Sequence, residues 1–93
     1  MQDKKKIAEI LSALGNVKRL DIINLISEGI SNPGDISKQM ANPRATIEKH
    51  IRVLLKANVI NKYPGLSLEG QTRIFYRLEE RMNSILRELN NLT

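Results

Sequence analysis

The chain has 93 residues, no cysteine and a formal net charge of +5 at pH 7. This length favours one domain covering residues 1–93, and a hydrophobic content of 41% is enough for one modest core. The lack of cysteine excludes disulfides, thiolate metal sites and a thiol nucleophile. No apolar run approaches the roughly 18 residues that span a membrane, so we expect a soluble, cytoplasmic protein.

The first two predicted helices lie before residue 30. Residues 3–14 carry isoleucine and leucine at helical spacing, and Gly15 supplies a C-terminal stop. Asn16 can cap a second helix that runs from Val17 to about Ser27. The density of isoleucine in this second helix predicts that it is well buried.

Two further helices form a predicted helix-turn-helix. Asn32, as a cap, starts a short helix over Pro33–Met40. Only two residues separate it from a longer helix, Pro43–Ala57, for which Asn42 is the expected N-cap. Asn58 can adopt the left-handed conformation that ends this longer helix. The short link fixes the angle between the two helices.

The helix 43–57 has one apolar and one basic face. At 100° per residue its apolar arc holds Ile47, Ile51, Leu54 and Leu55, and the opposite arc holds Ala45, Lys49, Arg52 and Lys56. A helix of this length, about 22 Å, suits insertion into a major groove about 12 Å wide. We therefore interpret it as a recognition helix. Its N-terminal residues Arg44, Ala45 and Thr46 are expected to meet base edges, while Glu48 balances nearby charge.

A β-hairpin follows the recognition helix. Two β-type runs, 59–63 and 71–78, flank a loop at 64–70 that contains proline and glycine. Apolar and basic residues alternate in the second run, so we interpret residues 59–78 as a wing with one basic face. The complete set of predicted DNA contacts on helix and wing is Arg44, Ala45, Thr46, Lys49, Arg52, Lys56, Lys62, Arg73 and Arg77.

The last predicted helix runs from Glu79 to about Asn91. Leu78 and the apolar residues after it are spaced 4-3-4-3, which is a heptad seam, and the first helix shows the same 4-3 spacing. We predict a two-fold homodimer held by both terminal helices. An alternative is that both helices fold onto their own domain. The predicted dimer residues are Ile7, Leu11, Leu14, Met82, Ile85, Leu89 and Leu92.

The resulting fold class is mainly α with a small β-hairpin, in the order α-α-α-α-β-β-α of a winged helix-turn-helix. Charge supports a nucleic-acid partner, because residues 38–77 hold eight basic and two acidic residues and the remainder of the chain carries −1. A solvated surface would explain the same charge equally well. Charge alone therefore leaves both interpretations open.

Four stretches resemble the ArsR-type winged-helix transcriptional regulators. Residues 11–20, LSALGNVKRL, are similar to that family's opening motif, and residues 46–54, TIEKHIRVL, to its recognition helix. Residues 56–60, KANVI, and 74–78, IFYRL, match its following turn and wing strand. Each motif is common by itself, but four in order at the right separations are specific. The resemblance implies a DNA-binding, repressor-like protein.

The sequence departs from the metal sensors of this family. The stretch 35–40 has no cysteine and the last helix has no histidine, so neither metal site can be carried over. His50 is the one histidine of the chain, and we interpret it as a packed, hydrogen-bonded side chain rather than a ligand. We expect no metal and no cofactor, and the sequence leaves a small-molecule effector unknown.

Three functions remain in competition. The first is a dimeric, sequence-specific regulator that acts at double-stranded DNA in the nucleoid. The second is a winged-helix module that binds protein, and the third is a nucleoid protein that binds DNA by charge alone. Arg44 and Thr46 favour the first over the third, because binding by charge needs no polar tip that reads bases. An enzyme has the least support, since the chain has no phosphate-cradling glycine loop and no catalytic triad.

Overall fold

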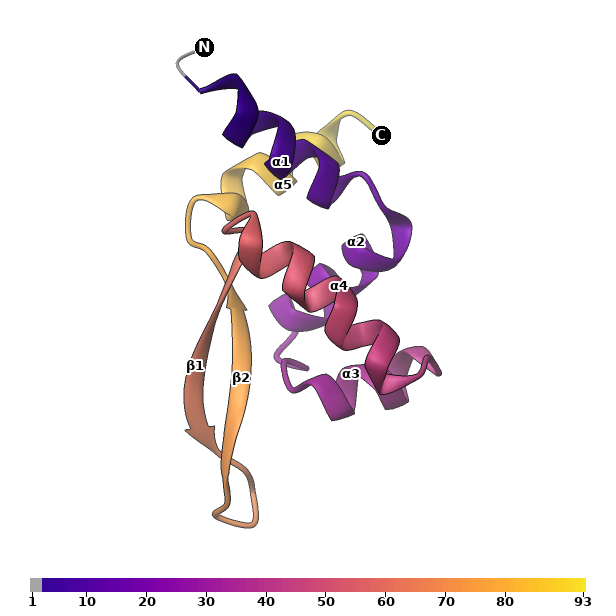
Figure 1. Cartoon of the computed structure of the whole chain (residues 1–93), viewed down its shortest axis with the longest axis vertical. Helices are drawn as coiled ribbons and strands as arrows, with labels where there is room; N and C mark the ends of the chain where they lie inside the picture. The colour runs from indigo at the N-terminus through magenta and orange to yellow at the C-terminus, as the bar shows by residue number, and fades with distance from the viewer. Residues whose placement is uncertain (1–2) are drawn as a thin grey trace.

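The computed structural model describes residues 3–93, and over these residues the chain forms helices and one two-stranded antiparallel sheet (Figure 1). The elements are α1 (Lys4–Leu14), α2 (Val17–Ser27), α3 (Pro33–Met40), α4 (Arg44–Lys56), β1 (Ile60–Leu66), β2 (Thr72–Leu78) and α5 (Met82–Asn91). This order confirms the predicted fold class. Within residues 3–93 no helix is both long and apolar enough to cross a membrane.

The helix-turn-helix begins as predicted but its second helix is capped differently. Asn16 and Asn32 accept backbone hydrogen bonds at the starts of α2 and α3, as expected. Asn42 does not cap α4, so that prediction was wrong. Ala41 takes the left-handed conformation, and the Asn42 side chain turns back to donate to the carbonyl of Met40. Pro43 then occupies the N-cap position without a side-chain hydrogen bond.

The C-terminal end of α4 follows the prediction more closely. The helix ends at Lys56, and Asn58 has a φ of 57°, the left-handed conformation expected there. Asparagine tolerates this conformation better than most residues, because its short polar side chain bonds locally. The chain can therefore leave α4 and enter the wing within three residues.

The first wing strand extends further than predicted, and the second begins one residue later, at Thr72. Pro64 and Gly65, which we placed in the loop, belong to β1 and pair with Ile74 and Arg73. Proline is tolerated because position 64 needs no N–H towards β2: the Tyr76 N–H points outwards to Ser31, and Pro64–Ile74 is the next pair in the same alternation. The turn itself covers residues 67–71, where Gly70 has a φ of 78°. The wing is therefore a regular ribbon with a tight tip.

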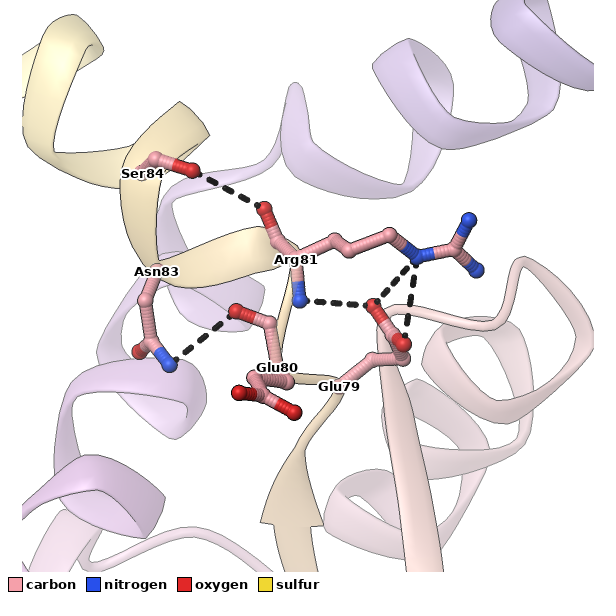
Figure 2. A network of polar contacts seen from close by, with 5 residues as sticks. All are labelled: Glu79, Glu80, Arg81, Asn83 and Ser84. Atoms are coloured by element: carbon pink, nitrogen blue, oxygen red, sulfur yellow. Dashed lines mark hydrogen bonds and ion pairs between the residues drawn. The ribbon is translucent and has the colours of Figure 1, made fainter.

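The last helix begins three residues later than predicted. The Glu79 carboxylate accepts from the backbone N–H of Arg81 at 2.9 Å and from its side-chain Nε at 3.3 Å (Figure 2). The Glu79 N–H donates to the carbonyl of Val59, which keeps this residue next to the sheet. Residues 79–81 thus form a turn that joins the wing to α5, instead of the first turn of the helix.

One buried apolar cluster includes residues from every helix and from the start of β1. Its members are Ala13, Leu14, Ile22, Ile23, Ile26, Ile36, Ile47, Ile51, Leu54, Ala57, Val59, Ile60 and Met82. The wing is tied to this cluster at its base, where the N–H of Tyr76 donates to the carbonyl of Ser31 at 2.9 Å. Figure 1 shows α1 and α5 towards one end of the long axis and the wing tip at the other.

Candidate nucleic-acid interface

The recognition helix α4 presents the two faces that its sequence predicts. Ile47, Ile51 and Leu54 are almost completely buried in the core. Ala45, Lys49, Arg52 and Lys56 are exposed on the opposite side, and Thr46 is half-buried. Burial of the apolar face fixes the rotation of the helix about its axis, so the basic face has to point outwards.

Arg44 at the start of α4 is held by an ion pair. Its Nε donates to the Glu48 carboxylate at 3.0 Å, one helical turn away. Both side chains are substantially exposed, 62% and 43%, so the pair adds only a few tenths of a kcal/mol. This agrees with the expected charge-balancing role of Glu48. The two terminal nitrogens of the guanidinium have no hydrogen-bond partner among the described residues and remain available to a ligand.

The wing places its cations on two faces. Lys62 pairs with Tyr76, in the same alternation as the buried Ile60, and so lies on the side that faces α4. Arg77 lies on the other side, where its Nε donates to Asn61 at 3.0 Å and its guanidinium lies 4.9 Å from the centre of the Tyr63 ring. Arg77 is therefore held against the outer surface of the wing.

A groove of about 550 Å³ lies between α4 and the wing. Arg44 and Arg52 from the helix and Lys62 from the wing line it, with Glu48 as the one acidic lining residue among those described. Arg73 also lines it, although along β2 it alternates in step with Arg77 rather than with Tyr76. Ile51, Leu55, Ile74 and Tyr76 add apolar side chains, and Asn32 and Pro33 at the start of α3 complete the lining. Cations from two separate elements thus converge on one concave surface, where they can act together on a polyanion.

The structure does not bring all predicted contact residues to this groove. Lys49 and Lys56 are exposed on α4 outside the groove, and Arg77 lies on the outer face of the wing. Whether each of the nine residues touches DNA stays a prediction. The structure divides them into three groups. The groove set is Arg44, Arg52, Lys62 and Arg73, the helix set on α4 is Ala45, Thr46, Lys49 and Lys56, and Arg77 is the one outer residue.

His50 lies on the other side of α4 from the groove set and has a structural contact. It is half-buried, and its Nδ1 lies 3.2 Å from a terminal nitrogen of Arg19 on α2. Burial, followed by the charges of Arg19, Lys18 and Lys49, lowers the pKa of His50 below its ordinary value. The imidazole is therefore neutral near pH 7. In residues 3–93 no three histidine or acidic side chains gather as a metal site would require.

Sequence reasoning missed the residues that orient these surfaces. The amide nitrogen of Asn32 donates to the carbonyl of Ile74 at 3.4 Å, so the cap of α3 also holds the wing. Lys18 on α2 donates to the side chain of Asn42 at 2.9 Å, in the turn before α4. Both contacts join residues far apart in the chain, and no local pattern signals them.

Comparisons with known proteins agree with this geometry. The family model described as bacterial regulatory protein, arsR family, matches residues 16–62. An uncharacterised helix-turn-helix transcriptional regulator of Methanocaldococcus jannaschii, MJ1325, is 29% identical over 99% of this chain and all of its own length.

Two solved structures share the fold. HlyU from Vibrio cholerae superposes with a TM-score of 0.77 at 21% identity, over 99% of this chain and 97% of its own. The homodimeric winged helix-turn-helix DNA-binding domain of Mb0332 from Mycobacterium bovis, a possible ArsR-family regulator, has a TM-score of 0.76 at 21% identity. That match covers 94% of this chain and 76% of the other.

Proposed function

The chain belongs to the arsR family of bacterial regulatory proteins and is a winged-helix transcriptional regulator that binds DNA, and from this premise we propose that it is a dimeric, sequence-specific repressor. The observation that carries the proposal is the exposed basic face of α4 beside the cationic groove. Lys49, Arg52 and Lys56 follow the phosphate backbone. Arg44, Ala45 and Thr46 reach base edges in the major groove.

The groove between helix and wing supports a second kind of contact. Its four cations from two elements suit a strand of the phosphate backbone, which carries one charge per nucleotide. Phosphate contacts fix the register of a protein on the duplex, while base contacts specify sequence. The wing therefore positions α4, and the N-terminal end of α4 reads the operator.

The apolar surface of the terminal helices supports the dimer. Leu11 on α1 is 61% exposed, Leu92 beyond α5 is 83% exposed, and Ile85 and Leu89 are also exposed. A shallow apolar hollow on α5 is lined by Ser84, Ile85, Glu88, Leu89 and Leu92. Apolar side chains left exposed in this way are penalised by water at about 25 cal/mol per Å², which favours a second copy as their cover. The homodimeric state of the Mb0332 domain is consistent with this arrangement.

Not all predicted dimer residues would contribute equally. Leu14 and Met82 are 5% exposed within the single chain, so they pack α1 and the start of α5 onto their own core. Ile7 is half-buried. The proposed contact surface therefore rests on Leu11, Ile85, Leu89 and Leu92, with Ile7 at its edge.

Two-fold symmetry determines the kind of operator. Two α4 helices related by a two-fold axis would meet successive major grooves about 34 Å apart, on half-sites about 10 bp apart centre to centre. The operator is then an inverted repeat, and a dimer across it excludes other proteins from the same DNA. That exclusion represses transcription, and we propose that it takes place in the cytoplasm, at the nucleoid.

A gel shift with the DNA upstream of the protein's own gene tests the proposal. We expect a complex that resists excess random competitor at two salt concentrations, and a footprint over an inverted repeat. Equal competition by random DNA would instead indicate an architectural protein that binds by charge. No complex with any duplex would indicate a module that binds protein.

A further inference from the structure

Arg19 on α2 is the side chain that joins the end of α1 to the middle of α4. Its Nε donates to the carbonyl of Ala13 at 2.7 Å, and Nη2 donates to the carbonyl of Ser12 at 3.2 Å. Its Nη1 lies 3.2 Å from Nδ1 of His50. The guanidinium of Arg19 thus connects α1, which belongs to the proposed dimer surface, with α4, the helix that would read DNA.

The surroundings of Arg19 favour this position. The last carbonyls of α1 lack partners within their own helix and lie at the negative end of its dipole, which attracts a cation. The backbone N–H of Arg19 donates to the side chain of Asn16 at 3.0 Å, so the main chain is fixed as well. The guanidinium has a rigid fork of donors that can meet two helices at once, which a lysine ammonium on a flexible stem does less well.

The contact with His50 exists in one protonation state. A guanidinium has donors only, so Nδ1 of His50 has to accept and the ring proton has to be on Nε2. A second proton would remove the acceptor and would place two cations 3.2 Å apart. The charged groups that act on His50 are Arg19 and Lys18 from α2 and Lys49 from its own helix, all of them basic.

We propose that Arg19 and His50 are a positioning pair that fixes α4 relative to α1, and that protonation of His50 releases it. The inference rests on the proposed function, because in a dimer held by α1 and α5 the placement of α4 on α1 sets the distance between the two reading helices. Neither residue touches DNA in this proposal. Both act through the position of α4.

The direction of the pH effect follows from the protonation states. Because folding lowers the pKa of His50, the contact is complete above about pH 6.5 and is lost as the pH falls through the folded-state value. Protonation also adds positive charge to α4, which strengthens attraction to any DNA. This added charge acts on operator and random DNA alike, whereas the loss of the Arg19–His50 contact affects only the reading of the operator. The ratio of operator affinity to random-DNA affinity should therefore fall. The chain has one histidine and no cysteine, so no other side chain ordinarily titrates between pH 5.5 and 7.5.

The test measures the ratio of operator affinity to random-DNA affinity at pH 7.5 and at one pH unit below the His50 pKa found by NMR titration, at constant ionic strength. In the wild type this ratio should fall about tenfold at the lower pH, a typical size for coupling between two sites. His50→Gln can still accept from Arg19 but cannot titrate, so its ratio should not change with pH. A pH response in His50→Gln equal to that of the wild type would overturn the proposal.

A matched control uses the neighbouring contact between α2 and the turn before α4. Asn42→Ala removes the hydrogen bond from Lys18 but no titratable group, so it should keep the wild-type pH response. Arg19→Lys should have a low ratio already at pH 7.5 and little further response. Circular dichroism at both pH values verifies that each variant is folded.

A readout without DNA separates this inference from the proposed function. An NMR titration of the His50 ring should give a pKa below the ordinary value in the wild type and a higher pKa in Arg19→Ala. If the wild type shows no operator preference at pH 7.5, the proposed function fails and this titration still decides the pair. An identical His50 pKa in both proteins would show that Arg19 does not act on the imidazole, and the proposal would be wrong.

Discussion

The face built by α4 and the wing differs from the face built by α1 and α5 in the chemistry that each leaves exposed. The first shows lysine and arginine around a groove, and the second shows leucine and isoleucine along a helical stripe. Charge acts at a distance and weakens with salt, whereas apolar contact is short-ranged and roughly proportional to the area that it covers. The two faces therefore suit two partners, a polyanion and a second copy.

The largest effect should come from the apolar face. Replacing Ile85 and Leu89 by Glu would place carboxylates in the proposed seam, so we expect monomers. Operator affinity should fall at least about 100-fold, because a dimer gains by engaging two half-sites at once. Sedimentation measures the oligomeric state, and gel shift measures the operator affinity. Asn83→Glu with Asn91→Glu adds the same charge to exposed polar positions of α5 and should leave both unchanged. A wild type that sediments as a monomer at micromolar concentration, together with full affinity of the seam variant, would contradict the dimer.

The next effect should come from the basic face. Replacing Lys49, Arg52, Lys62 and Arg73 by Ala should make the slope of log K against log salt shallower by about 3.6, since each phosphate contact contributes about 0.9. The control variant removes four exposed cations elsewhere, Lys4, Lys5, Lys6 and Arg87, and should keep the wild-type slope. An unchanged slope in the first variant would remove these residues from the DNA interface.

A smaller and different effect is expected from Arg44→Ala. A bidentate contact with a base is worth about 1–3 kcal/mol of discrimination, so operator preference should fall while the salt slope changes little. Arg81→Ala also removes an arginine paired with a glutamate, but away from the groove, and should change neither quantity. Competition between operator and random duplexes measures the preference. A loss of affinity that is equal for both duplexes would make Arg44 a phosphate contact.

Metal should have no effect on either face. The chain has no cysteine and a single histidine, and that histidine already contacts Arg19. Operator affinity measured with zinc and with a chelator should therefore agree within error. A tenfold response to either would reveal a site built from carboxylates or shared between subunits.

Local signals were enough to predict the elements of this protein. Apolar spacing located the helices, Asn16 and Asn32 marked two helix starts, and Asn58 marked the end of α4. Each signal depends on residues within about four positions of one another, so the sequence carries it complete. The two faces of α4 and the basic character of the wing follow from the same local periodicity.

Only the tertiary structure decided which side chains face each other. The 4-3 seam could not separate Leu14 and Met82, which pack inside, from Leu11 and Ile85, which stay exposed, because periodicity gives a face but not what covers it. Arg19 and His50 are 31 residues apart and meet only when α1, α2 and α4 pack together. Asn42 carries a cap signal, yet its side-chain oxygen accepts from Lys18, 24 residues away, and its amide donates to Met40, so the local pattern did not reveal its real partners.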